Sequence, residues 1–96
     1  MLTVCIVARI KAGQEPAFES GFAQLAEMIA AEPGCAGVTW GATETPREYA
    51  IVERYRDQAA LEAHRASPHM KQLGPGIIAL FDGAPEIARF IEQRSF

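Results

Sequence analysis

The first eleven residues alternate between two faces, and this pattern constrains the fold more than any other in the chain. One face carries five apolar side chains, those of Leu2, Val4, Ile6, Ala8 and Ile10. A period of two with β-branched residues predicts a β-strand over residues 2–11. Because the other face is also apolar in its middle, at Cys5 and Val7, we expect both faces of this strand to be covered.

Further periodicities predict the remaining elements. Helical or alternating spacing predicts a helix over 14–32, strands over 36–44 and 49–55, a helix over 57–66, a short helical turn over 77–81 and a last strand over 86–94. Turn residues set the boundaries: Pro33 and Gly34 end the first helix, Asp57 is a good N-cap for the second, and residues 74–76 (Gly-Pro-Gly) act as a breaker.

The order β-α-β-β-α-β, with the extra helical turn before the last strand, is that of an α+β, ferredoxin-like fold. A chain of 96 residues is expected to form a single domain, residues 1–96. In this fold, helices cover one sheet face, and the bare face would carry Cys5, Val7, Ala50 and Val52. Since an exposed apolar sheet face is unusual in a soluble monomer, we predict a symmetric homodimer in which two sheets face each other.

Composition excludes several classes of partner. The net charge is −3 and the nine basic residues are scattered, which argues against a nucleic-acid surface. No apolar run approaches the ~20 residues that span a bilayer, so no membrane association is expected. The apolar N-terminal segment is interrupted by Arg9 and Lys11, unlike a secretion signal. We therefore expect a cytoplasmic protein, with Cys5 and Cys35 as buried free thiols.

The chain has two histidines, His64 and His69, and both lie in residues 61–71. Leu61 and His64 are three residues apart on the predicted helix, so they share a face. Histidine exchanges protons readily near neutral pH. An inward His64 is thus either a core side chain bonded to a backbone carbonyl or a catalytic base, and both alternatives stay open. Spacing of five residues, with no third ligand evident, predicts no metal site.

Four other features bear on a site. A buried carboxylate at Glu53 would need a partner, such as His64, Arg9 or Arg65, unless it forms a salt bridge near the sheet edge. Trp40 is expected in the core or at a dimer contact, or as a platform for a ligand. The first helix is expected to contribute core residues that could form a pocket wall, among them Phe22. Its acidic side chains are expected to form a solvated face, at Glu15, Glu19, Glu27 and Glu32.

Several segments resemble the antibiotic biosynthesis monooxygenase family, and most closely its small quinol monooxygenases. The resemblance is carried by Met1–Val4 with Arg9 and Gly13-Gln14, Glu32–Cys35, Glu53–Asp57, and Leu61–His64 with Ser67–Lys71. The segment from Leu61 to Lys71 is the most specific of these. The resemblance implies a dimeric α+β barrel. It also implies chemistry with O2 on small aromatic quinols or anthrones, with no metal or flavin cofactor.

Within that chemistry the residues take definite candidate roles. His64 is the candidate base that deprotonates the substrate. Tyr55 and Trp40 could pack on the substrate ring and donate a hydrogen bond to its oxygen. Glu53 could orient His64 or hold its protonated form. The remaining candidate substrate contacts, at a cavity entrance and wall, are His69 and Phe22.

Two other functions stay open. An isomerase acting through an enediol on a small ketone substrate, phosphorylated or hydroxylated, would need cationic groups, for which the candidates are Arg9, Arg54, Arg65 and Lys71. A non-catalytic dimeric module that binds a small apolar ligand would use the same pocket without turnover.

Overall fold

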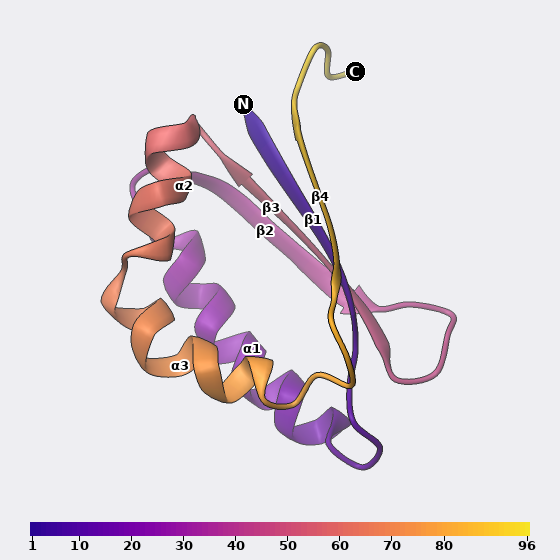
Figure 1. Ribbon diagram of the computed structural model, residues 1–96. Helices are drawn as coiled ribbons and strands as arrows, with labels where there is room; N and C mark the ends of the chain where they lie inside the picture. The colour runs from indigo at the N-terminus through magenta and orange to yellow at the C-terminus, as the bar shows by residue number, and fades with distance from the viewer.

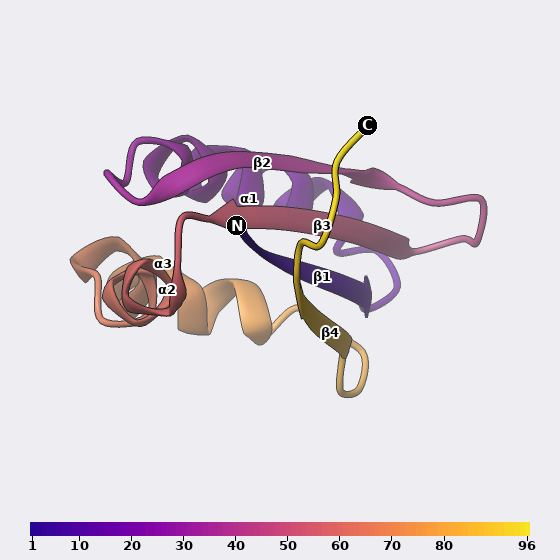
Figure 2. The same ribbon diagram turned by 90° about the horizontal axis from the view of Figure 1, so that it is seen from above.

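The computed structural model describes residues 1–96 and shows an antiparallel sheet with its helices packed on one side (Figure 1). The elements in chain order are β1 (Leu2–Arg9), α1 (Glu15–Ala30), β2 (Cys35–Ala42), β3 (Glu48–Tyr55), α2 (Gln58–Arg65), α3 (Pro68–Ile78) and β4 (Glu86–Ile91). The sheet has four strands in the order β2-β3-β1-β4, which Figure 2 shows from above. The predicted α+β, ferredoxin-like arrangement is confirmed, with one more full helix than expected.

The predicted alternation of β1 is visible in the sheet register. Ile6 lies between Ile51 of β3 and Ile87 of β4, because β1 pairs antiparallel with both strands. Val4 and Ala8 are buried on the face that the helices cover. Apolar side chains of α1 close this core from the other side, namely Phe18, Phe22, Leu25, Ala26 and Ile29.

Helix α2 begins as its sequence predicts. Asp57 has an extended backbone, and its Oδ1 atom accepts a hydrogen bond of 2.9 Å from the backbone N–H of Ala60. This satisfies one of the free N–H groups in the first turn. The cap fixes where α2 starts and therefore which face of it, with Leu61 and His64, is buried.

Helix α3 corrects the prediction of a short helical turn over 77–81. The Ser-Pro step that ends α2 also starts α3, because the Ser67 hydroxyl accepts from the N–H of Met70 and Pro68 occupies the first helical turn. The helix then continues through residues 74–76 despite Pro75 within it. Packing on α1 outweighs the local preference: a Cβ atom added at Gly21 would lie 2.8 Å from Cδ1 of Ile77.

The sheet face opposite the helices is uncovered (Figure 1). The side chains predicted for it, Cys5, Val7, Ala50 and Val52, are partly exposed. Strand β4, which ends at Ile91 and not at residue 94, adds Phe90 to this face with 51% of its surface exposed. Neither cysteine forms a disulfide, and Cys5 and Cys35 are only half-buried.

The three helices have between 8 and 16 residues, and none is long and apolar enough to cross a membrane.

Candidate functional site

A chain of polar side chains runs from the core of the sheet to the surface. Its members, in spatial order, are Tyr55, Glu53, His64, Glu32 and His69. They come from β3, α2, the turn after α1, and the start of α3. The inner three are almost fully buried, so their polar atoms depend on one another for partners.

Tyr55 and Glu53 form the inner end of this chain. They are two residues apart on β3 and therefore share a face. The Tyr55 hydroxyl donates a hydrogen bond of 2.6 Å to Oε1 of Glu53. Burial raises the pKa of the Tyr55 hydroxyl, and the hydrogen bond to Glu53 raises it further, so Tyr55 remains protonated as a donor. This bond supplies one partner that a buried carboxylate requires.

His64 bridges two carboxylates. Its Nε2 atom lies 3.8 Å from Oε1 of Glu53, and its Nδ1 atom lies 2.9 Å from Oε2 of Glu32. The imidazole is tilted against the Tyr55 ring, with 5.2 Å between ring centroids. Its side chain is 6% exposed. His64 faces inward with a carboxylate on either side, and no backbone carbonyl satisfies its ring.

The position of Glu32 differs from the prediction. The predicted place is the solvated face of the first helix, but α1 ends at Ala30 and the Glu32 side chain is only 11% exposed. The turn that follows bends toward α2. Gly34 permits the close approach, since a Cβ atom there would lie 2.4 Å from Cβ of Ala60. The Glu-Pro-Gly sequence was the available signal, because a residue beyond the last helical turn does not belong to the helix surface.

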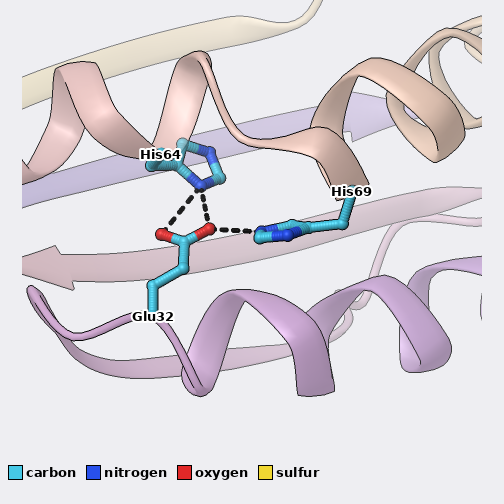
Figure 3. A group of neighbouring side chains, drawn as sticks. All are labelled: Glu32, His64 and His69. Atoms are coloured by element: carbon cyan, nitrogen blue, oxygen red, sulfur yellow. Dashed lines mark hydrogen bonds and ion pairs between the residues drawn. The ribbon is translucent and has the colours of Figure 1, made fainter.

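His69 completes the cluster at the outer end. It lies in the first turn of α3, and its Nε2 atom is 2.5 Å from Oε2 of Glu32 (Figure 3). At the C-terminus of α2, the Ser67 hydroxyl donates a hydrogen bond of 2.6 Å to the His64 carbonyl oxygen. His69 thus pairs with Glu32, and both histidine rings point at the same carboxylate (Figure 3).

Two hollows lie on either side of the Glu53–His64 pair. An apolar cavity of about 300 Å³ lies between the sheet and helices α1 and α3, and Glu53 is the one charged residue in its lining. An outer groove of about 780 Å³ is lined by Glu32, His64 and His69. His64 therefore lines the groove and not the apolar cavity, with Glu53 between the two.

The other predicted substrate contacts are divided by the fold. Phe22 lines the apolar cavity. Trp40 packs edge-on against Phe22, with ring centroids 5.0 Å apart, and does not line the cavity. The Tyr55 ring is fully buried, so it is not available as a stacking surface. The structure thus brings Glu53 and Phe22 together at the cavity and leaves Trp40 in the aromatic core.

The cationic side chains considered for an isomerase lie elsewhere. Arg54 forms an ion pair of 2.9 Å with Glu92, and Arg9, Arg65 and Lys71 are exposed. None of them lines the apolar cavity. The cavity therefore offers no positive charge to an enediolate or a phosphate.

On the exposed face of the first helix, Glu19 also binds a side chain of the core. Glu19 accepts a short hydrogen bond from the Tyr49 hydroxyl. This bond raises the pKa of Tyr49 to about 12, and burial adds to the shift. Glu19 is nevertheless exposed as predicted, whereas Glu32 is not.

Comparisons with known proteins agree with this architecture. The model of the antibiotic biosynthesis monooxygenase family matches residues 1–74. None of the curated protein sequences compared with this chain matches it.

Solved structures share the fold over nearly the whole chain. A crystal structure of an antibiotic biosynthesis monooxygenase is 24% identical, with a TM-score of 0.90, and the alignment covers 98% of this chain and 100% of that chain. Rv0793 from Mycobacterium tuberculosis is 20% identical with a TM-score of 0.90, covering 98% and 96%. SnoaB, a cofactor-independent oxygenase from Streptomyces nogalater, is 21% identical with a TM-score of 0.84, covering 98% and 94%.

Proposed function

The chain belongs to the antibiotic biosynthesis monooxygenase family, and we propose that it is a cofactor-independent monooxygenase of a small quinol or related aromatic. The observation that carries the proposal is the apolar cavity of about 300 Å³ with the Glu53 carboxylate as its one charged lining group. A flat aromatic substrate would fill the apolar part, and its acidic hydroxyl or methylene would lie against the carboxylate.

A base is the main requirement of this chemistry. A neutral quinol or anthrone reacts slowly with O2, whereas its anion gives up an electron far more readily. In the proposal Glu53 accepts the substrate proton, a contribution typically of about 10²- to 10⁴-fold. Tyr55 and His64 both approach Oε1 of Glu53, so Oε2 is the oxygen left without either partner.

The overall reaction needs no external reductant. One atom of O2 enters the product as a new carbonyl or hydroxyl oxygen, and the other leaves as water. The substrate supplies both electron pairs that reduce O2. It loses two hydrogens, which end up in the water, and one of its carbons is oxidised. SnoaB, a cofactor-independent oxygenase with this fold, supports the reaction class without identifying a substrate.

His64 takes a different role from the one suggested by its position on the helix. It lies behind Glu53 with 3.8 Å between Nε2 and Oε1, on the side of the outer groove. We therefore assign the proton acceptor that touches the substrate to Glu53. His64 is a positioning residue that contacts Glu53 from behind, and Glu32 holds its ring from the other side.

We also propose the homodimer through the uncovered sheet face. Partly exposed Cys5, Val7, Ala50 and Val52 form a continuous apolar patch with Phe90 on β4. A second copy of the same face would cover it with apolar surface, as isologous interfaces do.

Oxygen consumption with reduced naphthoquinones and with anthrones tests the activity. Wild-type protein should accelerate uptake above the spontaneous rate, and Glu53→Gln should lower kcat by on the order of 10² or more. Glu27→Gln is the matched control, because it makes the same change on the exposed face of α1 and should leave the rate unchanged. His64→Ala should reduce the rate less than Glu53→Gln; a variant within about twofold of wild type would remove His64 from the mechanism.

Two results would favour the other functions. Binding of a quinol, seen as a change in Trp40 fluorescence, without any oxygen uptake would indicate a non-catalytic binding module. Exchange of solvent deuterium into a small ketone, abolished by Glu53→Gln, would indicate an isomerase. Either result would overturn the monooxygenase proposal.

A further inference from the structure

The outer groove contains a cluster whose ligand atoms do not touch the substrate in the proposed oxygen chemistry, although His64 and Glu32 support Glu53 from behind. Glu32, His64 and His69 each offer one ligand atom, and these atoms all lie within 4.8 Å of one another (Figure 3). We propose that this cluster binds a divalent transition-metal cation of the Zn²⁺ type. The proposal does not rest on the monooxygenase activity.

The ligand atoms lie close enough together to be brought onto one cation. Metal–ligand bonds to imidazole nitrogen and carboxylate oxygen are about 2.0–2.2 Å, so ligand atoms on one ion lie no more than ~4.4 Å apart. The Glu32 carboxylate lies 2.9 Å from Nδ1 of His64 and 2.5 Å from Nε2 of His69. These two distances are those of hydrogen bonds, and all three ligand atoms lie within 4.8 Å of one another. Side-chain movements of about an ångström would place an ion among the three.

The ligands are held before any ion binds. They come from three different segments, and their side chains are 6%, 11% and 19% exposed for His64, Glu32 and His69. The cap by Asp57 sets the start of α2, and Ser67 sets the start of α3. A cluster fixed in this way loses little conformational freedom on binding.

The ligand types select the class of cation. Two imidazole nitrogens and one carboxylate oxygen suit Zn²⁺, Co²⁺, Ni²⁺ or Cu²⁺, whereas Mg²⁺ and Ca²⁺ prefer sites made of oxygen ligands. Three protein ligands on the wall of a groove of about 780 Å³ leave further coordination positions open to water or a small ligand. The competing explanation is an ion pair of Glu32 with protonated histidine, which needs no ion.

A cation here would also act on the neighbouring cavity. Coordination through Nδ1 of His64 leaves the ring proton on Nε2, the atom 3.8 Å from Glu53. The ion would thereby fix the tautomer of His64, which lies next to Glu53, the one carboxylate of the cavity. The His64 ring would thus connect the outer groove to the inner cavity.

Titration of chelator-treated protein with metal alone tests the site. Zn²⁺ followed by calorimetry, and Co²⁺ followed by its visible absorption, should both bind with one ion per chain, and Mg²⁺ should not compete. Glu32→Gln and His69→Ala should each weaken binding by on the order of 100-fold or more. Mutation of a residue that only supports a metal ligand already costs about 10- to 100-fold in affinity, and these two residues would bind the ion directly. Glu27→Gln should bind as wild type does.

Imidazole NMR of the wild-type protein gives a readout that needs no variant. Because the chain has only two histidines, stoichiometric Zn²⁺ should shift the signals of both rings and leave His64 with its proton on Nε2. Unshifted imidazole signals, or Glu32→Gln that binds as tightly as wild type, would overturn the proposal and leave the cluster as an ion pair. Since no substrate is present, this outcome is independent of the monooxygenase test.

Discussion

The Tyr55 hydroxyl and the Glu53 carboxylate form a hydrogen bond of 2.6 Å within the core. Both residues are at most 5% exposed, so neither group can exchange its partner for water. Each group therefore depends on this one bond for a partner within the core.

Tyr55→Phe removes that donor and leaves the Glu53 carboxylate short of a partner. We expect the free energy of unfolding to fall by about 1–3 kcal/mol, the cost of an unsatisfied buried acceptor. Urea denaturation measures this. Tyr49→Phe is the comparison, because its partner Glu19 is exposed and can be hydrated, so its loss should be smaller. Equal losses in the two variants would contradict the role given to burial.

Gly34→Ala should destabilise the junction between the α1 turn and α2. An added Cβ atom would lie 2.4 Å from Cβ and 3.3 Å from Cα of Ala60, so backbone must move. We expect a loss of about 1–3 kcal/mol, typical of overpacking, measured by thermal or urea unfolding. Gly41→Ala, with nothing within 4 Å of its new Cβ atom, should change stability little. If both variants unfold alike, the close approach is not what requires glycine.

Tyr49 should ionise at a higher pH than an unfolded tyrosine, and its ionisation should favour unfolding. Its hydrogen bond to Glu19 raises the pKa to about 12, above the ordinary tyrosine value of about 10. A group whose pKa is raised on folding contributes stability that is complete below the unfolded pKa and disappears as pH rises through the folded one. Stability should therefore fall between about pH 10 and 12, and less so in Tyr49→Phe. Tyrosinate absorbance at pH 10.5 equal to that of free tyrosine would disprove the shift.

Cys35 should react slowly with alkylating agents. Burial raises the pKa of its thiol, and the carboxylates of Glu32 and Glu53 raise it further, so less thiolate is present at a given pH. In a Cys5→Ser background, iodoacetamide should modify Cys35 more slowly at pH 8 than it modifies an unstructured cysteine peptide. Mass spectrometry follows the reaction, and a rate equal to that of the peptide would show that the thiol is not shielded.

Val52→Glu should separate the proposed dimer. It places a charge in the middle of the uncovered sheet face, where a partner sheet would bury it at high cost. Sedimentation at micromolar concentration should show a dimer for wild type and a monomer for the variant. Gln24→Glu adds the same charge on exposed α1 and should remain dimeric. A monomeric wild type would exclude the interface.

Local patterns were sufficient for most of the backbone. The alternation of residues 2–11 and the spacing of Phe18, Phe22, Leu25 and Ile29 predict elements that the structure contains, because period and burial are properties of a single segment. The N-cap at Asp57 was equally local. Residues 74–76 misled because their helix-breaking preference is overridden by the contact of Ile77 with Gly21 on another helix.

The site was predicted in part. An inward His64 with a carboxylate partner followed from its spacing to Leu61 and from the cost of burying Glu53. That Glu32 is the closer partner of His64 did not follow from the sequence. Glu32 is 32 residues away in sequence and reaches His64 only because the chain turns at Pro33-Gly34 and packs against α2. His69 joins through the unforeseen start of α3.

Sequence alone therefore determined every element except α3, and the family to which the chain belongs, since each of these is written in short-range spacing and in motifs. Tertiary structure alone decided that Glu53, and not His64, faces the apolar cavity, and that Glu32 joins the two histidines. The physical reason is that a side chain's partner depends on which segments pack together, and that is a property of the whole core.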